Sequence, residues 1–198
     1  MFQKEIQHDV FLRLLEERHA DAAFAAVERD RAYLRRWLPW VDQTTDVSYT
    51  AGFIKTSLEQ FAHNEGLAAG IWCSEEFIGT VGTHKIDWAN RKVEMGYWIA
   101  SRYQGRGIIT AGCSALIDHA FTEWKLNRVE IHCATSNDKS SAIPKRLGFQ
   151  FEGVRREGQR VNGEYIDIQV YALLFREWTA RAPLFQPATQ IGSRSSAP

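Results

Sequence analysis

The sequence predicts a single domain of the α/β class, of the α+β kind, with helices flanking a mixed, mostly antiparallel sheet of about seven strands. Its 198 residues suit one domain with a sizeable core, and its composition is that of a globular protein, with 44% hydrophobic and 24% charged residues. Seven segments have the short, alternating or β-branched pattern of strands. They are residues 10–15, 67–73, 77–84, 92–99, 128–134, 149–156 and 164–174.

The first half of the chain is predicted to form one strand, two helices and a meander. Residues 16–30 are rich in alanine, which favours a helix. Pro39 interrupts the stretch that follows, and residues 50–65 form a second predicted helix, in which Phe53 and Ser57 recur at helical spacing. Short turns join the next three strand segments, which predicts an antiparallel meander.

The second half is predicted to add a long helix, a strand, a short helix and a last pair of strands. Ile109, Cys113 and Ala120 lie along one stripe of the long helix. Residues 137–147 then form a short helix that Gly148 ends.

The chain divides into one domain and a tail. No apolar pattern continues after Trp178, so we expect the domain to span residues 1–180 and residues 181–198 to be a flexible C-terminal tail without a core of its own.

Charge and cysteine content exclude several classes of protein. Lys and Arg number 24, as do Asp and Glu, so the chain does not have the basic excess of a nucleic-acid binder. No stretch is long and apolar enough for a membrane span, and the N-terminus lacks a secretory signal. The three cysteines have no C-x-x-C spacing, which predicts neither disulfides nor a zinc site. They are Cys73, Cys113 and Cys133. We therefore expect a cytoplasmic protein with no metal, no membrane partner and no nucleic-acid partner.

The stretch SRYQGRGIITAG, residues 101–112, has the composition of a phosphate-binding loop at the start of a helix. It is not a P-loop, because no Gly-Lys pair is followed by Ser or Thr. The dinucleotide fingerprint G-x-G-x-x-G fails as well, since Thr110 stands where the third glycine should be. The pattern Q/R-x-x-G-x-G/A, which binds the pyrophosphate of coenzyme A, is matched from Gln104 onward, except at Ile109. A helix start that needs unusual φ angles remains the alternative reading of the two glycines.

Five segments together resemble the GNAT acetyltransferase superfamily, in particular its ribosomal-protein N-terminal, serine-type subfamily. They are YLRRWLPWVDQT, VEMGYWI, YQGRGIITAG, NRVEIHCATSNDKSSAIPKRLGF and FEGVRRE, in this order between about Val10 and Trp178. The resemblance implies a GNAT fold, in which the fourth strand (92–99) splays from the fifth (128–134). It also implies an N-acetyltransferase that uses acetyl-CoA as co-substrate and transfers the acetyl group directly to an amine.

The resemblance assigns a set of residues to coenzyme A. The pantetheine would pair with backbone in the gap between the splayed strands, and the pyrophosphate would lie on the glycine loop, with Arg102 and Arg106 nearby. The implied binding residues are Ile99, Ala100, Gln104, Gly105, Arg106, Gly107, Ile108, Ile109, Thr110, Asn137 and Ser140.

Two catalytic roles follow from the resemblance. Ser140 would donate a hydrogen bond to the departing thiolate, although a helix cap explains Asn137 and Ser140 as well. The position where many relatives carry a tyrosine acid holds Pro144. Glu94 would act as the base, beside the room that Gly96 leaves.

The identity of the catalytic base stays open, for two reasons. An ion pair of Glu94 with Lys92 or Arg128 is the alternative to the catalytic role. A second carboxylate that close relatives carry is replaced here by Gln159.

The acceptor is the least constrained part of the prediction. The segments that hold Trp37, Trp40, Asp42 and Trp88 resemble the acceptor side of the family, with core packing or helix capping as the alternative. His84 receives no role. A protein N-terminus is the favoured acceptor, and a small-molecule amine such as an aminoglycoside, polyamine or amino acid is the alternative. A coenzyme A sensor without turnover and a homodimer also stay open.

Overall fold

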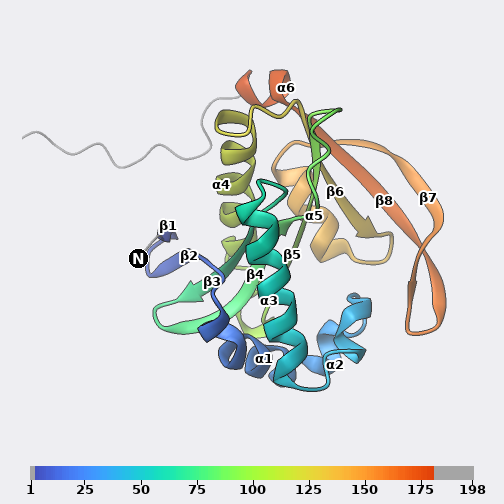
Figure 1. Ribbon diagram of the computed structural model, residues 1–198. Helices are drawn as coiled ribbons and strands as arrows, with labels where there is room; N and C mark the ends of the chain where they lie inside the picture. The colour runs from blue at the N-terminus through green and yellow to red at the C-terminus, as the bar shows by residue number, and fades with distance from the viewer. Residues whose placement is uncertain (1–2, 181–198) are drawn as a thin grey trace, which may run out of the picture.

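The computed structural model describes residues 3–180, so the predicted tail at 181–198 lies outside the described residues (Figure 1). It contains an eight-stranded sheet with the strand order β1-β2-β3-β4-β5-β6-β8-β7. The strands are β1 (Gln3–Gln7), β2 (Val10–Leu14), β3 (Ala68–Cys73), β4 (Glu76–Thr83), β5 (Lys92–Ile99), β6 (Arg128–Ala134), β7 (Gln150–Val161) and β8 (Glu164–Leu174). All seven predicted strands are present, and the predicted α+β class is confirmed.

The eighth strand is the difference from the prediction. β1 pairs antiparallel with β2 through a tight turn at Asp9, whose φ is +59°. Its sequence, QKEIQ, lies at the sheet edge and is largely exposed, so it lacks the apolar alternation by which strands are recognised. β7 also runs five residues beyond the predicted end at residue 156.

The sheet opens between β5 and β6, which are its one parallel pair among the described strands. The pairing begins at Lys92 with Arg128 and stops at Met95 with Ile131. Beyond that point β5 follows β4 as far as Ile99, while β6 follows β8. The predicted splay between these two strands is therefore confirmed, and it leaves two facing edges without a neighbouring strand.

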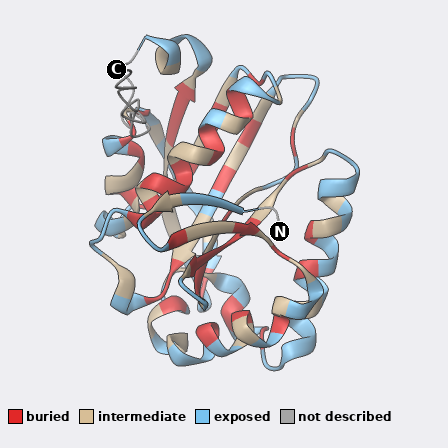
Figure 2. Ribbon diagram, turned by 90° about the vertical axis from the view of Figure 1, so that its left-hand side faces the viewer, coloured by how far each residue is buried: buried red, intermediate tan, exposed pale blue. Residues whose placement is uncertain are grey.

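Helices cover both faces of the sheet (Figures 1 and 2). The longer ones are α1 (Ala20–Arg29), α3 (Val47–Ala62), α4 (Ile108–Thr122) and α5 (Asp138–Arg146), and two short ones are α2 (Arg31–Leu34) and α6 (Phe175–Thr179). One core packs the predicted α4 stripe, including Ile109, Cys113 and Ala120, on the sheet. A second core packs α1 and α3 on the other face, around Trp72 and Phe77.

The buried face of α3 differs from the predicted one. Ile54 and Ser57 are buried, whereas Phe53 is exposed. Ser57 satisfies its hydroxyl by donating to the carbonyl of Phe53. The ring of Phe53 is exposed because it lines the cavity described below and is not packed in the core.

Candidate active site

A long cavity follows the line along which β5 and β6 part. Its volume is about 1720 Å³, and it runs from the glycine loop before α4 to an aromatic wall formed by α2, α3 and the short helix η2 (Pro39–Asp42). Most of the residues predicted from the sequence line it. They are Trp37, Trp40, Glu94, Ile99, Gln104, Gly105, Arg106, Gly107, Ile108, Ile109, Thr110, Asn137 and Ser140.

Three predicted residues lie elsewhere. Ala100 donates its N–H to the carbonyl of Ile78, at 2.7 Å, and does not line the cavity. Asp42 accepts two hydrogen bonds of 3.0 Å from the guanidinium of Arg35. Trp88 donates its indole N–H to the carbonyl of Asn64 at 2.9 Å. The structure therefore does not bring these three together with the other candidates.

The glycine loop ends as the N-terminus of α4. Gly105 and Gly107 both have φ of +74°, a conformation that side chains disfavour, and Gly107 is the N-cap. Amide groups in the first turn of a helix have no acceptor within the helix. Those of Ile108, Ile109 and Thr110 point out of the helix start, where the dipole is positive, and this favours an anion.

Cations from a second element face this loop. Lys139 of α5 donates to the side-chain oxygen of Gln104 at 2.9 Å, and Arg146 donates to the hydroxyl of Thr110 at 3.1 Å. Arg106 lines the cavity and stacks over Tyr103. Arg102, which was expected near the pyrophosphate, forms an ion pair with Glu76 and does not line the cavity.

We expect Gly107→Val to weaken the binding of coenzyme A at least about tenfold. A β-branched residue disfavours positive φ, so the backbone would change and the N–H groups of the first turn would point in another direction. Isothermal calorimetry with coenzyme A measures this. The control is Gly163→Val, at the tip of the β7–β8 hairpin, where φ is +87° and no atom lies within 4 Å of an added Cβ. Equal affinities of the two variants would contradict the loop's role.

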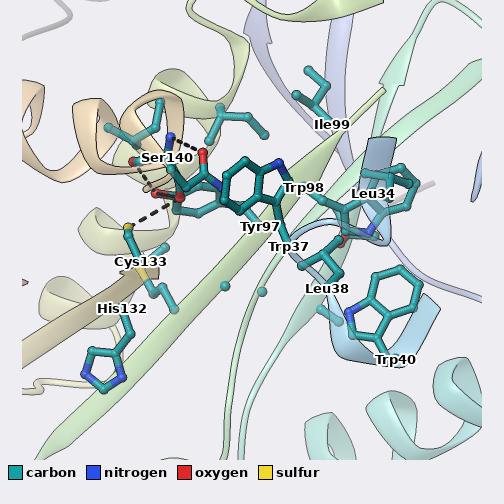
Figure 3. Close-up of a pocket in the computed structure, with 18 of the residues that line it drawn as sticks. Leu34, Trp37, Leu38, Trp40, Tyr97, Trp98, Ile99, His132, Cys133 and Ser140 are labelled. Carbon is teal, nitrogen blue, oxygen red and sulfur yellow. Dashed lines mark hydrogen bonds between the residues drawn. The ribbon is translucent and has the colours of Figure 1, made fainter. Parts of the chain in front are cut away.

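Ser140 is held at the start of α5, on one side of the cavity (Figure 3). Its backbone N–H donates to Asn137 Oδ1 at 3.1 Å, so the predicted helix cap is present. Its hydroxyl lies 3.3 Å from Cys133 Sγ and 3.4 Å from the hydroxyl of Tyr97. Tyr97 in turn donates to the carbonyl of Ser140 at 3.0 Å. Burial raises the pKa of Tyr97 well above its usual value, so this hydroxyl keeps its proton.

Glu94 lies at the mouth of the gap between two histidines. Its Oε2 is 3.0 Å from Nδ1 of His132, and its Oε1 is 3.7 Å from Nε2 of His84. The predicted alternative, an ion pair with Lys92 or Arg128, is wrong. Both of those cations pair with Glu130, which lies opposite Glu94 on β6.

His132 bridges two carboxylates. Its Nε2 lies 3.0 Å from Glu130 Oε2, and only 14% of its side chain is exposed. The hydrogen bond that His132 donates to Glu94 is the main reason why the pKa of His132 is raised, and the contact with Glu130 adds to it. Burial raises the pKa of Glu94, but His132, His84 and Arg155 outweigh that effect and lower it overall. Glu94 is therefore an anion, and its contact with His132 favours the protonated form of that imidazole.

Aromatic and apolar side chains form the opposite wall. Trp37, Leu38 and Trp40 approach Trp98 of β5, and the rings of Trp40 and Trp98 are 6.3 Å apart (Figure 3). The β7–β8 hairpin closes the far side of this half, since Asn162 near its tip donates to the carbonyl of Arg35 at 2.9 Å. Aromatic and apolar side chains therefore surround the half of the cavity that lies away from the glycine loop.

Three residues of the site were missed in the sequence. His132 alternates with the buried Val129, Ile131 and Cys133, and this alternation places it on the face of Glu94. His84 was assigned no role, although it directly ends a strand. Tyr97 gave no local signal, because its contact with Ser140 crosses the gap between two distant segments.

Two further features concern metal ions and membranes. Within residues 3–180, side chains of His, Cys, Asp and Glu do not form a group of three or more that would hold a metal ion. No helix in the same range is both long and apolar enough to cross a membrane.

Comparison with known proteins agrees with this geometry. The family model described as acetyltransferase (GNAT) domain matches residues 9–150. A Bacillus subtilis (strain 168) protein named "Putative ribosomal N-acetyltransferase YdaF" is 38% identical over 179 residues, which cover 90% of this chain and 98% of the relative. The ribosomal-protein-serine acetyltransferase of Escherichia coli (strain K12) is 26% identical, over 85% of this chain and 94% of its own.

A solved structure supports the same assignment. It is that of RimL, a ribosomal alpha-N-protein acetyltransferase, in complex with coenzyme A. It superimposes with a TM-score of 0.85 at 25% identity, over 89% of this chain and 99% of the other.

Proposed function

Because this chain belongs to the GNAT acetyltransferase family and is an acetyl-CoA-dependent N-acetyltransferase, we propose that its acceptor is the α-amine of a protein N-terminus. The observation that carries the proposal is the cavity itself. It joins an anion-binding helix start to a wide aromatic half that contains very little negative charge.

The residues present fit coenzyme A. The first-turn amides of α4 suit the pyrophosphate, and Arg106, Lys139 and Arg146 supply cations around it. The unpaired edge of β5 up to Ile99 offers backbone groups to the pantetheine. When bound, acetyl-CoA supplies a thioester carbonyl, at which the C–N bond to the amine forms and the C–S bond breaks.

Ser140 is proposed to stabilise the leaving thiolate by donating a hydrogen bond. A serine hydroxyl holds its proton too firmly to give it up to a thiolate, so the stabilisation is electrostatic. Tyr97 positions this hydroxyl, because it holds the carbonyl of Ser140 and its own oxygen lies within reach of Ser140 Oγ.

Glu94 is proposed to bind the acceptor amine. Its lowered pKa and its pairing with His132 favour holding an ammonium group over removing a proton from it. Weak basicity in the site favours α-amines. Deprotonation at pH 7 costs about 1 kcal/mol for an α-amine and about 4.6 kcal/mol for a lysine side chain.

The acceptor half of the cavity offers little attraction to polycationic small molecules. The carboxylates that line the whole cavity are Glu94 and Asp138. Of the lining cations, Arg106, Lys139 and Arg146 surround the proposed pyrophosphate site, and Lys85 and Arg155 remain. A polyamine or aminoglycoside would therefore find few carboxylates there. An uncharged peptide segment behind an α-amine needs no further carboxylate and can pack on Trp40 and Trp98.

An acceptor panel tests the proposal. Thiol release from acetyl-CoA is followed with peptides that begin with Ser or Ala, with the same peptides blocked at the N-terminus, with lysine peptides and with spermidine. We expect turnover for free N-termini at least about tenfold above that for lysine or spermidine. Mass spectrometry locates the acetyl group. Faster turnover with spermidine would contradict the proposed acceptor. Coenzyme A binding without turnover of any amine would favour a sensor instead.

A ribosomal-protein acceptor would make the cytoplasm the place of action, and we propose that location for the chain. The relatives named for ribosomal-protein acetylation support it.

A further inference from the structure

We infer that His84 is a catalytic residue which takes the proton from the acceptor amine, while Glu94 binds and orients that amine beside it. The inference rests on the proposed function and adds to it the identity of the proton acceptor. It stands on the position of His84 over the gap between β5 and β6.

The location of His84 is defined by β5. Its backbone N–H donates to the carbonyl of Glu94 at 2.9 Å, directly after the last β4–β5 pair at Thr83 and Met95. The two side chains therefore lie next to each other on neighbouring strands. His84 lines the cavity, and 69% of its side chain is exposed, so a substrate can reach the ring.

Gly96 leaves the space between the two groups open. A Cβ added at Gly96 would lie 3.8 Å from Nε2 of His84, in ordinary contact with the ring. Any larger side chain at Gly96 would extend toward the place where the amine has to lie. The glycine thus leaves room directly beside the imidazole nitrogen.

The distance between His84 and Glu94 suits a shared donor. Nε2 and Oε1 are 3.7 Å apart, which is too long for a direct hydrogen bond between them. A single amine nitrogen between the two atoms can donate one hydrogen to each. One N–H bond of the ammonium breaks as its proton moves to Nε2, and the electron pair left on nitrogen forms the new C–N bond to the thioester carbon. The C–S bond breaks, and the second proton that nitrogen loses on becoming an amide goes to the leaving thiolate.

The other charged groups around this point are unsuited to accept the proton. Both ring nitrogens of His132 on β6 are already engaged, since each lies 3.0 Å from a carboxylate oxygen, one of Glu94 and one of Glu130. Lys85, next along the chain, pairs with Glu65 at 2.7 Å. Arg155 on β7 is a permanent cation. Imidazole is the side chain that exchanges protons most readily near neutral pH, and the exposed ring of His84 can pass its proton to water.

The test is the pH dependence of kcat/KM for an α-amine peptide at saturating acetyl-CoA, from pH 6 to 9. His84→Gln should lose about tenfold at pH 7, where only about a tenth of the α-amine is neutral, and should approach the wild-type rate at pH 9. Glu94→Gln should raise the KM for the peptide and keep the acidic limb of the profile, because it removes the group that binds the amine and leaves the proton acceptor in place. His63→Gln, at the exposed end of α3, is the control and should match the wild type.

The possible outcomes distinguish a wrong assignment of His84 from a wrong proposed function. A loss in His84→Gln that is the same at every pH would indicate a structural role and overturn the inference. An acidic limb that disappears in Glu94→Gln would also overturn it, because Glu94 would then be the group that takes the proton. Absence of turnover by the wild-type protein with every amine would instead contradict the proposed function. Should His84→Gln unfold, His84→Asn is measured in its place, and the same pH-independent loss would overturn the inference.

Discussion

Ser140→Ala is expected to lower kcat about 100-fold with little change in the KM for acetyl-CoA. The hydroxyl that lies between Cys133 and Tyr97 would no longer donate to the sulfur as charge develops on it. A thioester sulfur accepts hydrogen bonds weakly and a thiolate strongly, so the loss appears in the transition state and not in binding. Steady-state kinetics with the best peptide of the acceptor panel measures the two constants.

The neighbouring serine gives a matched control. Ser141 lies on the same helix and is buried, but its hydroxyl donates to the carbonyl of Asp138 and it does not line the cavity. Ser141→Ala should keep the wild-type kcat even if it lowers stability. Full turnover of Ser140→Ala at saturating acetyl-CoA would remove the proposed role of this hydroxyl.

Gly79→Ala is expected to cost about 3 kcal/mol of folding free energy. The Cβ would lie 2.3 Å from the carbonyl oxygen of Trp98 and 2.9 Å from Cα of Ile99. Both are backbone atoms of β5, so rotamer changes cannot relieve the clash and the two strands must separate. Thermal denaturation should show the melting temperature falling by about 6–12 °C.

The same substitution at Gly52 is expected to have the opposite effect on stability. It is exposed in the middle of α3, and no atom lies within 4 Å of an added Cβ. Gly52→Ala should raise stability by about 0.5–1 kcal/mol, since alanine favours the helix more than glycine does. An unchanged melting temperature for Gly79→Ala would show that the close approach of β4 and β5 is not maintained in solution.

The fold was predictable where periodicity and turn residues agree. The stripe on α4 and the alternation in β6 follow directly from their apolar spacing, and both are buried as expected. β1 was not predictable, because this edge strand is mostly Gln, Lys and Glu and has no buried face. Its sequence therefore lacks alternating apolar residues. The buried face of α3 was misjudged because Phe53 is aromatic yet turned toward the cavity.

The candidate site was predictable to the extent that its residues are neighbours in the sequence. The glycine loop and the cap formed by Asn137 are local motifs. The partners of Glu94 are not, since His84 and His132 come from two other strands and meet it only through the sheet register. For the same reason, the sequence of β5 alone could not predict that Lys92 pairs with Glu130 of β6 and not with Glu94.

The short parallel ladder between β5 and β6 has a consequence for cooperativity. Only the pairs from Lys92–Arg128 to Met95–Ile131 join the strands on either side of the gap, and the rest of the connection passes through the core beneath α4. The two halves of the sheet are therefore weakly coupled across the gap itself. A ligand whose backbone-like groups fill the gap acts as a missing strand. Its binding energy then adds to the coupling between the halves, so acetyl-CoA would make unfolding more cooperative as well as less favourable.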